Sequence, residues 1–340
     1  MNKNTCVPLE LVKQYSRKYT NCWKKIDYEK SGFNEEYPVI KSIARVVMSK
    51  KRKNSDKIAY MHDTTIDLEM LYALSLWRRN KQIYSFYGEL EELLYEQSTD
   101  DFSVPVDVLQ NLPFPCIFIE TKKLDMMDVL GFFAFYLVKE NKKQFRLMLV
   151  TKEFFIPVPI YLAKNQNIKN VFSQIFNHYS SFTQKRHPCP EQDYKKQADQ
   201  YIHVVNSAMQ LLLYICAQNA EISEKTESRK AYKKSPKIIK DQYKEIRQFE
   251  CGKKTSEIIR KTFKTHSSEM ADDELQIVFL QKTGNKKRPH VRKGHWHHYW
   301  IGSKKGRNRQ LKLNWIAPSI IHQEVFDEAK IPTTINQIYD

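Results

Sequence analysis

Basic and aromatic side chains interleave in the segment Lys286 to Trp300, which reads KKRPHVRKGHWHHYW. No acidic residue occurs between Glu274 and Glu324. Arginine and lysine hold phosphate groups and aromatic rings stack on flat groups, so this composition is typical of a binding groove for polyanions. The sequence QLKLNWIAP follows at Gln310 to Pro318, and we expect the two segments to form a pair of strands.

Side chains alternate between the two faces of a strand. If residues 295–300 form one, its two faces differ in chemistry. We expect one face to pack on the core through two tryptophans, and the other to present imidazoles. The first face would hold Trp296, His298 and Trp300, and the second His295, His297 and Tyr299.

Three interpretations of the histidines compete. A metal site could use His290, His295 and His297, but no Cys, Asp or Glu stands nearby to complete the ligand shell. A ribonuclease could use two histidines as acid and base, with Arg292 holding a phosphate. A rigid strand could simply form a basic binding surface. We favour the third interpretation, and we expect neither a metal nor a cofactor.

The composition favours a soluble protein with acidic partners. The chain has 340 residues, 41% of them hydrophobic, and a formal charge of +17. Such an excess favours nucleic acid, a ribosome surface or an acidic protein, although lysine also serves as general surface filler. Neither GxGxxG nor GxxxxGK[ST] is present, which argues against a phosphate-binding glycine loop.

The cysteines and the apolar runs indicate the compartment. Six cysteines are dispersed without a CxxC pair, and Cys116 and Cys216 lie in apolar runs, where we expect them to be buried. The first residues lack the apolar stretch of a secretion signal, and the run Leu211 to Ala217 is too short to span a bilayer. We therefore expect a cytoplasmic protein.

The elements that would position the basic segment divide into helices and strands. Apolar spacing predicts an N-terminal helix that begins after Pro8 and two more that run through Ile40–Val47 and Leu68–Trp77. It also predicts a helix at Ile168–Phe182 and a core helix at Ala198–Ala217. Short apolar and aromatic runs at about ten-residue spacing predict an antiparallel meander. Its expected strands are Cys116–Glu120, Gly131–Lys139, Phe145–Thr151 and Phe154–Leu162, with a further strand at Ser256–Phe263.

These elements predict an α+β fold: N-terminal helices, a central antiparallel sheet with packed helices, and a C-terminal basic strand pair. We expect five parts along the chain. They are an N-terminal helical region (1–104), an α+β core (105–220), a basic charged connector (221–274), the C-terminal basic segment (275–323) and a tail (324–340).

The pattern Arg-Pro-His-Val-Arg-Lys-Gly-His-Trp-His at residues 288–297, continuing to Tyr299, Trp300 and Gly302, resembles the C-terminal signature of a type V-A anti-CRISPR family, the second of its type. The strand sequences at 116–119 and 131–136, the prolines at 157 and 159, and the helix at 211–217 follow in matching order. The resemblance covers roughly residues 105–318. The chain differs from the family pattern in its lysine content, in His298 and in its longer tail.

The resemblance implies a function. Members of that family bind the nascent N-terminal peptide of the type V-A effector nuclease, after which its message and synthesis fall. We therefore expect an anti-CRISPR protein of a mobile genetic element whose partners are this peptide and RNA or the ribosome. We expect it to act by binding and not by its own reaction. The residues expected to contact the partner are Arg288, His290, Arg292, His295, Trp296, His297, Tyr299 and Trp300, with Trp315 as a packing support.

Two alternatives stay open. The histidines of the same segment could make the chain a ribonuclease, which would cut message without a ribosome. The chain could also be a nucleic-acid-binding protein of a plasmid or phage with no role against CRISPR, since a shared fold does not fix a shared target.

Overall fold

The fold is described from a computed structural model of the chain. It describes residues 6–28, 37–49, 57–97, 104–122, 124, 126–139, 142–160, 170, 191–225, 246–267, 290–292, 294–303 and 309–321. Three expectations lie outside these residues: the tail at 324–340, Arg288, and the helix at 168–182. Of that helix only position 170 is described.

Four helices occupy the N-terminal part of the described chain. Each buries an apolar stripe at helical spacing, such as Leu9, Val12 and Tyr15 in the first. The expected helices after Pro8, at Ile40 and at Leu68 are confirmed, and a short helix that we did not expect lies between the first two. The helices are α1 (Val7–Lys18), α2 (Cys22–Tyr28), α3 (Ile40–Met48) and α4 (Lys57–Asn80).

Asp67 of α4 ties α1 to this group. Its carboxylate accepts hydrogen bonds from the Tyr15 hydroxyl at 2.9 Å and the Tyr19 hydroxyl at 2.5 Å, and Lys18 Nζ lies 2.6 Å away. Asp67 is buried, so these donors replace the water that the carboxylate loses on folding. They fix the position of α1 on α4.

The sheet has seven strands in the order β5-β4-β3-β2-β1-β7-β6. Neighbouring strands pair antiparallel, except that β1 runs parallel to both β2 and β7. The strands are β1 (Gln82–Phe86), β2 (Cys116–Glu120), β3 (Val129–Lys139), β4 (Lys142–Thr151), β5 (Phe155–Ile160), β6 (Ile222–Glu224) and β7 (Arg247–Cys251). The four strands of the expected meander, β2 to β5, are confirmed.

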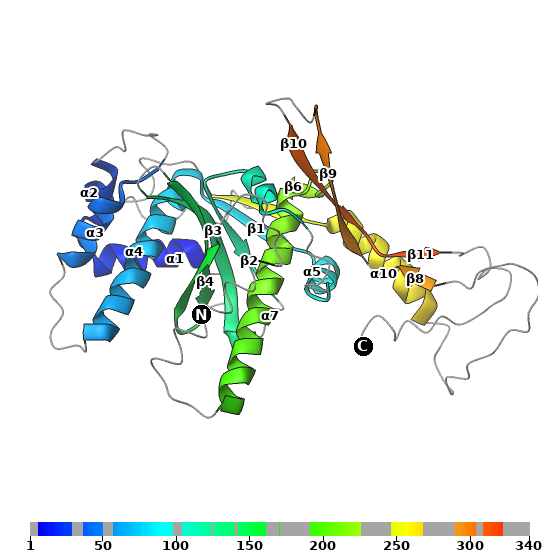
Figure 1. The fold of residues 1–340 in the computed structure, drawn as a ribbon, viewed down its shortest axis with the longest axis horizontal. Coiled ribbons are helices and arrows are strands. Elements are labelled where there is room, and N and C mark those ends of the chain that lie inside the picture. The colour runs from blue at the N-terminus through cyan, green and yellow to red at the C-terminus, as the bar shows by residue number, and fades with distance from the viewer. Residues whose placement is uncertain are drawn as a thin grey trace, which may run out of the picture.

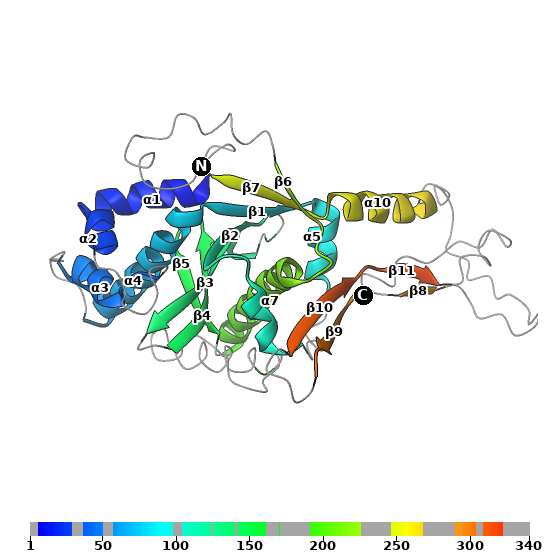
Figure 2. The same ribbon diagram turned by 90° about the horizontal axis from the view of Figure 1, so that it is seen from above.

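Helices cover both faces of the sheet. Figures 1 and 2 show α4 on one face and α7 (Glu191–Cys216), which contains the expected core helix, on the other. Ring contacts agree, since Tyr72 of α4 lies 6.2 Å from Phe135 of β3 and Tyr214 of α7 lies 5.7 Å from Phe86 of β1. A sheet covered on both sides has strands that are apolar on both faces, as in β2. The expected α+β architecture is confirmed.

Short elements complete the core. They are α5 (Gly88–Tyr95), η2 (Val106–Asn111), η3 (Met126–Asp128) and α10 (Lys253–Ser267). Cys116 and Cys216 are buried as expected, and burial raises the pKa of the Cys216 thiol to about 12. Among the described residues, no helix is long and apolar enough to cross a membrane.

The strand expected at Ser256–Phe263 is wrong, because these residues belong to α10. The strand before it, β7, ends at Cys251, and the next residue, Gly252, has a φ of 74°, which suits glycine and turns the chain into the helix. Ile258 is exposed while Ile259 is buried, which is one apolar face of a helix. The short run was ambiguous because periodicity alone does not separate a strand from a helix of this length.

Candidate functional site: the C-terminal basic hairpin

The basic segment forms an antiparallel ribbon. β9 (His295–Ile301) pairs with β10 (Gln310–Ile316), and Trp296 lies opposite Trp315. Beyond Gly294 and Pro318 the ribbon continues as β8 (His290–Arg292) and β11 (Ser319–Ile321). Figure 1 shows one end of the β9–β10 hairpin projecting beyond α7 and the sheet. The expected strand pair is therefore present, as a ribbon separate from the seven-stranded sheet.

The inner face of the hairpin packs on α7. Trp296 is buried, and its Nε1 donates to Gln210 Oε1 at 2.7 Å. Trp315, also buried, meets the ring of Tyr214 edge-on at 5.8 Å. Leu313, two residues before Trp315 on β10, is fully buried. These contacts fix the base of the hairpin on the end of α7, with Trp315 buried against Tyr214.

The free edge of β10 is held by the residues that follow α7. The Gln218 backbone N donates to Leu313 O at 2.8 Å. The side chain of Asn219 bonds Trp315 twice, accepting from its N at 2.9 Å and donating to its O at 2.7 Å. Asn219 thus takes the place of a neighbouring strand and satisfies backbone groups that would otherwise be buried without partners.

Gly294 marks the bend between β8 and β9. A Cβ at this position would lie 3.1 Å from Gln97 Nε2, 3.2 Å from Pro318 Cδ and 3.3 Å from Ile316 O. The position therefore tolerates a side chain only if its neighbours shift by a few tenths of an ångström. The small residue lets both strands bend close to the end of α5.

The outer face presents the imidazoles. His297 is exposed, and its ring lies 5.7 Å from that of Tyr299. The Tyr299 hydroxyl reaches Gln218 Oε1 at 3.4 Å. His295 is half-buried on the same face. The strand alternation therefore places His295, His297 and Tyr299 together, as the sequence predicts.

Trp300 does not pack on the core. It shares a strand face with Trp296, but it is 41% exposed, although Leu311 opposite it is buried. The Arg309 guanidinium stands over its ring, 4.6 Å from the centroid. The expectation that both tryptophans bury one face is therefore wrong for Trp300, because a strand face is buried only where another element covers it.

His298 lies on the inner face, opposite Leu313. Partial burial lowers the pKa of His298, and the neighbouring His297 lowers it further. The neutral imidazole is therefore favoured, and His298 is suited to packing rather than to binding an anion.

His290 and Arg292 belong to β8, whose backbone alone is described. They lie on the continuation of the ribbon and not beside His295 and His297 in β9. Among the residues whose side chains are described, no group of three His, Cys, Asp or Glu could hold a metal ion. Nothing in the described geometry brings Arg292 to the pair of histidines that a ribonuclease would use.

Four residues of this surface were missed by the sequence analysis: Gln210, Gln218, Asn219 and Arg309. Arg309 could have been found, because it directly precedes the second strand in a tract without acids. The other three lie in or after α7, and nothing in sequence connects them to residues about ninety positions later.

Comparisons with known proteins agree with the resemblance. The AcrVA2-like sequence profile, of the anti-CRISPR type V subtype A2 family, matches residues 84–323. The crystal structure of AcrVA2 is similar over 93% of this chain and 97% of that chain, with a TM-score of 0.53 and 17% sequence identity. At this identity the likeness speaks for the fold alone. No curated protein matches the chain.

Proposed function

This chain belongs to the AcrVA2-like family of anti-CRISPR proteins, and we propose that it lowers the synthesis of a type V-A CRISPR effector nuclease by binding the effector's nascent N-terminal peptide in the cytoplasm. The β9–β10 hairpin is the contact surface in this proposal. The observation that carries it is a docked ribbon with exposed aromatic and basic side chains, in which β9 pairs with β10 alone among the described strands.

The mounting supports recognition of a flexible ligand. Trp296, Trp315 and Asn219 fix the base of the hairpin on α7 before any partner binds. A surface that is already ordered loses little conformational entropy on binding, whereas an emerging peptide must be ordered. A preorganised ribbon therefore suits such a ligand.

The open edge supports recognition of an extended peptide. Within the described chain, β9 pairs with β10 alone, so its other edge has no neighbouring strand. An extended peptide could pair with this edge through its backbone, and side chains nearby would select the sequence. Trp300, Ile301 and Ile316 are exposed large apolar residues on the same hairpin and would supply such contacts.

The charge supports a site near RNA. The segment between Glu274 and Glu324 is basic throughout, and Arg309 and Lys312 stand on the described part of the hairpin. Ribosomal RNA and message are polyanions, which attract such a surface. The proposed partners are therefore the nascent peptide together with RNA or the ribosome.

The test is cell-free translation with purified protein, in which message and product of a type V-A effector gene are measured. One control gene carries first codons that encode a different peptide, and another carries synonymous codons. We expect message and product to fall for the native and the synonymous gene, and to be unchanged for the altered peptide. Equal loss from all three genes would favour a general nuclease and contradict the proposal.

A variant links the effect to the hairpin. Trp300→Ala with Ile301→Ser should weaken the effect on the native gene, since both side chains are exposed and contribute little to the core. The control is Met48→Ala with Ile258→Ser, which removes two apolar residues that are still more exposed, at other places on the surface. For the ribonuclease alternative, purified protein and message alone are incubated, and His297→Ala should abolish any cutting that occurs.

A further inference from the structure

A second basic surface lies in the N-terminal helices, away from the hairpin. It is a pocket of about 560 Å³ between α2 and α3. A pocket of this volume is large enough for a small ligand or one nucleotide. It is lined by Asn21, Lys24, Lys25, Ser42, Arg45, Val46 and Ser49.

Helical spacing explains why these residues face one another. Lys24 and Lys25 lie on α2, directly after Asn21 at its start, and positions 42, 45 and 46 lie on α3, which ends just before Ser49. The spacing of three and four residues places each set on one side of its helix. Ser42 and Val46 are buried at the base of the pocket, whereas Lys24, Lys25 and Arg45 are exposed. The cationic groups therefore surround an opening whose base carries a hydroxyl group.

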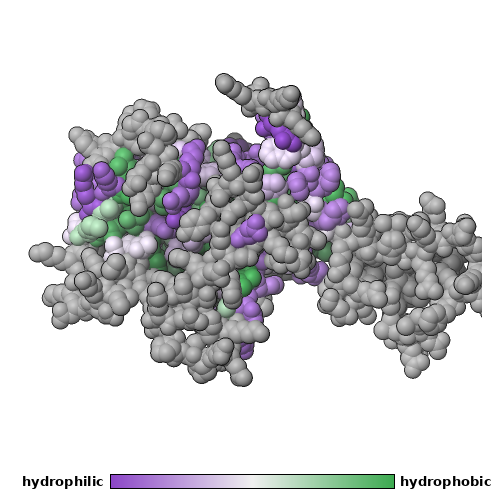
Figure 3. All heavy atoms as spheres, viewed as in Figure 1, coloured by the Kyte–Doolittle hydropathy of each residue, from purple (hydrophilic) through white to green (hydrophobic). Residues whose placement is uncertain are grey.

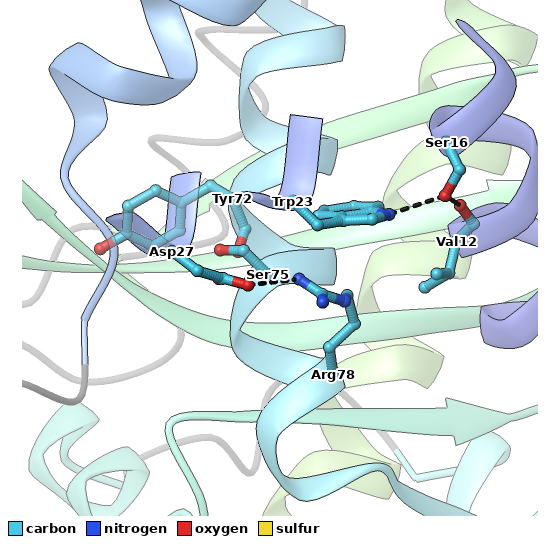
Figure 4. Close-up of polar contacts among 7 residues, drawn as sticks. All are labelled: Val12, Ser16, Trp23, Asp27, Tyr72, Ser75 and Arg78. Carbon is cyan, nitrogen blue, oxygen red and sulfur yellow. Dashed lines mark hydrogen bonds and ion pairs between the residues drawn. The ribbon is translucent and has the colours of Figure 1, made fainter. Parts of the chain in front are cut away.

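The opposite face of α2 is fixed to the fold, as Figure 4 shows. Trp23 Nε1 donates to Ser16 Oγ of α1 at 2.7 Å, and the Arg78 guanidinium of α4 lies 4.4 Å from the centre of the indole ring. Arg78 also donates to Asp27 Oδ2 at 3.3 Å. Because Trp23 is anchored on two helices, Lys24 and Lys25 are presented in a fixed direction.

The described residues that line the pocket carry positive charge only. None of its lining residues is acidic, and Asp27 of α2, the acid nearest in sequence, is engaged by Arg78. Figure 3 shows hydrophilic side chains gathered over this end of the molecule, beside apolar ones. Three cationic side chains in one concavity match a phosphate chain, whose charges repeat along the ligand.

We propose that the pocket between α2 and α3 binds backbone phosphates of RNA. The choice of RNA rests on the proposed function, which places the protein beside message and ribosome. The pocket lies outside residues 84–323, which match the family profile, and so adds a second contact to that of the hairpin. Figures 1 and 2 place the two surfaces on opposite sides of the seven-stranded sheet.

The test is binding of a labelled uridine homopolymer to the full chain, measured by fluorescence anisotropy at several salt concentrations. The variant is Lys24→Gln, Lys25→Gln and Arg45→Gln combined. The control is Lys196→Gln, Lys253→Gln and Lys254→Gln, which removes the same charge at other exposed positions. We expect the Kd of the pocket variant to rise about tenfold or more, and its salt slope to fall by about 2, or roughly 0.7 for each lost phosphate contact.

An equal loss of RNA affinity in the pocket variant and the control would overturn the proposal, because the loss would then come from net charge alone. A third variant, Lys24→Arg, Lys25→Arg and Arg45→Lys, keeps the charge and should bind as the unchanged chain does. Weak binding by this variant would instead indicate a damaged fold and would remove the support. A polyglutamate competitor that displaces the homopolymer at equal charge would also overturn the assignment to RNA.

RNA binding by the pocket and peptide recognition by the hairpin can be measured separately, so one proposal can fail without the other. A pocket variant that has lost RNA binding should still distinguish the native from the altered N-terminal peptide in a pull-down with synthetic peptides. Loss of RNA binding with intact peptide recognition would support the pocket alone. Absence of peptide recognition in the unchanged chain would contradict the proposed function and leave the RNA result standing.

Discussion

Trp296 and Trp300 lie on the same face of one strand, yet their surroundings differ. Trp296 is buried on α7 and donates to Gln210, whereas Trp300 is exposed under the guanidinium of Arg309. The first ring stabilises the docked hairpin, and the second is available to a partner. At the scale of single residues, the same side chain is thus buried at one position and exposed four residues later.

The two tryptophans allow a matched test. Trp296→Phe leaves the buried Gln210 Oε1 without its donor, which costs about 1–3 kcal/mol. Trp300→Phe, the same chemical change at an exposed site, should alter the free energy of unfolding by less than about 0.5 kcal/mol. Urea denaturation measures both. Similar losses for the two variants would contradict the assignment of Trp296 to the core.

His298 predicts a pH dependence. Its pKa is lowered from the ordinary 6.5, so the unfolded chain binds a proton more readily than the folded one. The free energy of unfolding therefore falls as pH drops below about 6.5, and the full contribution is present above that value. Urea denaturation at about pH 7.5 and 5.5 should show a smaller difference for His298→Asn than for the unchanged chain. His203→Asn, at an exposed position of α7, is the control.

At the scale of elements, side chains from distant segments satisfy the exposed backbone groups of a strand edge and of a helix N-terminus. Asn219 pairs with the edge of β10, and Glu221 caps α10. The Glu221 carboxylate accepts from the Lys254 N at 2.8 Å, from the Thr255 N at 2.9 Å and from Thr255 Oγ1 at 3.0 Å. Burial opposes ionisation, but these hydrogen bonds outweigh it and lower the pKa of Glu221.

This cap can be removed by substitution. Glu221→Ala leaves the first amides of α10 without an acceptor and should cost about 1 kcal/mol of stability. Glu224→Ala removes a nearby surface ion pair with Arg247 and should cost less, since exposed pairs contribute little. Hydrogen exchange of the α10 amides should increase in the first variant and not in the second. Equal exchange would mean that α10 does not depend on Glu221.

At the scale of the whole molecule, one hydrophobic cluster connects the two proposed contact surfaces. It contains Tyr15 and Trp23 near α2, the phenylalanines of the sheet, and Trp296 and Trp315 of the hairpin. The chain, whose formal charge is +17, thus has a single hydrophobic core that lies between the two proposed basic surfaces. Such an arrangement suits a large polyanionic partner that meets the protein at more than one place.

The sequence by itself determined the elements with strong local signals. Apolar spacing located α1, α3, α4 and α7, and aromatic and β-branched runs located β2 to β5. The unusual composition of residues 288–300 identified the family and the surface to study. These signals lie within a few residues of one another, where periodicity and composition are read directly.

Only the tertiary structure decided which of these side chains are covered. β1 was missed because only Lys81 separates Gln82–Phe86 from α4, so no turn in the sequence marks its start. It lies between β2 and β7 and joins the two parts of the sheet. Trp300 was expected in the core because alternation gives the face of a strand but not which side chains of that face are covered. The pocket between α2 and α3 depends on the packing of two short helices, a contact that neither segment encodes alone.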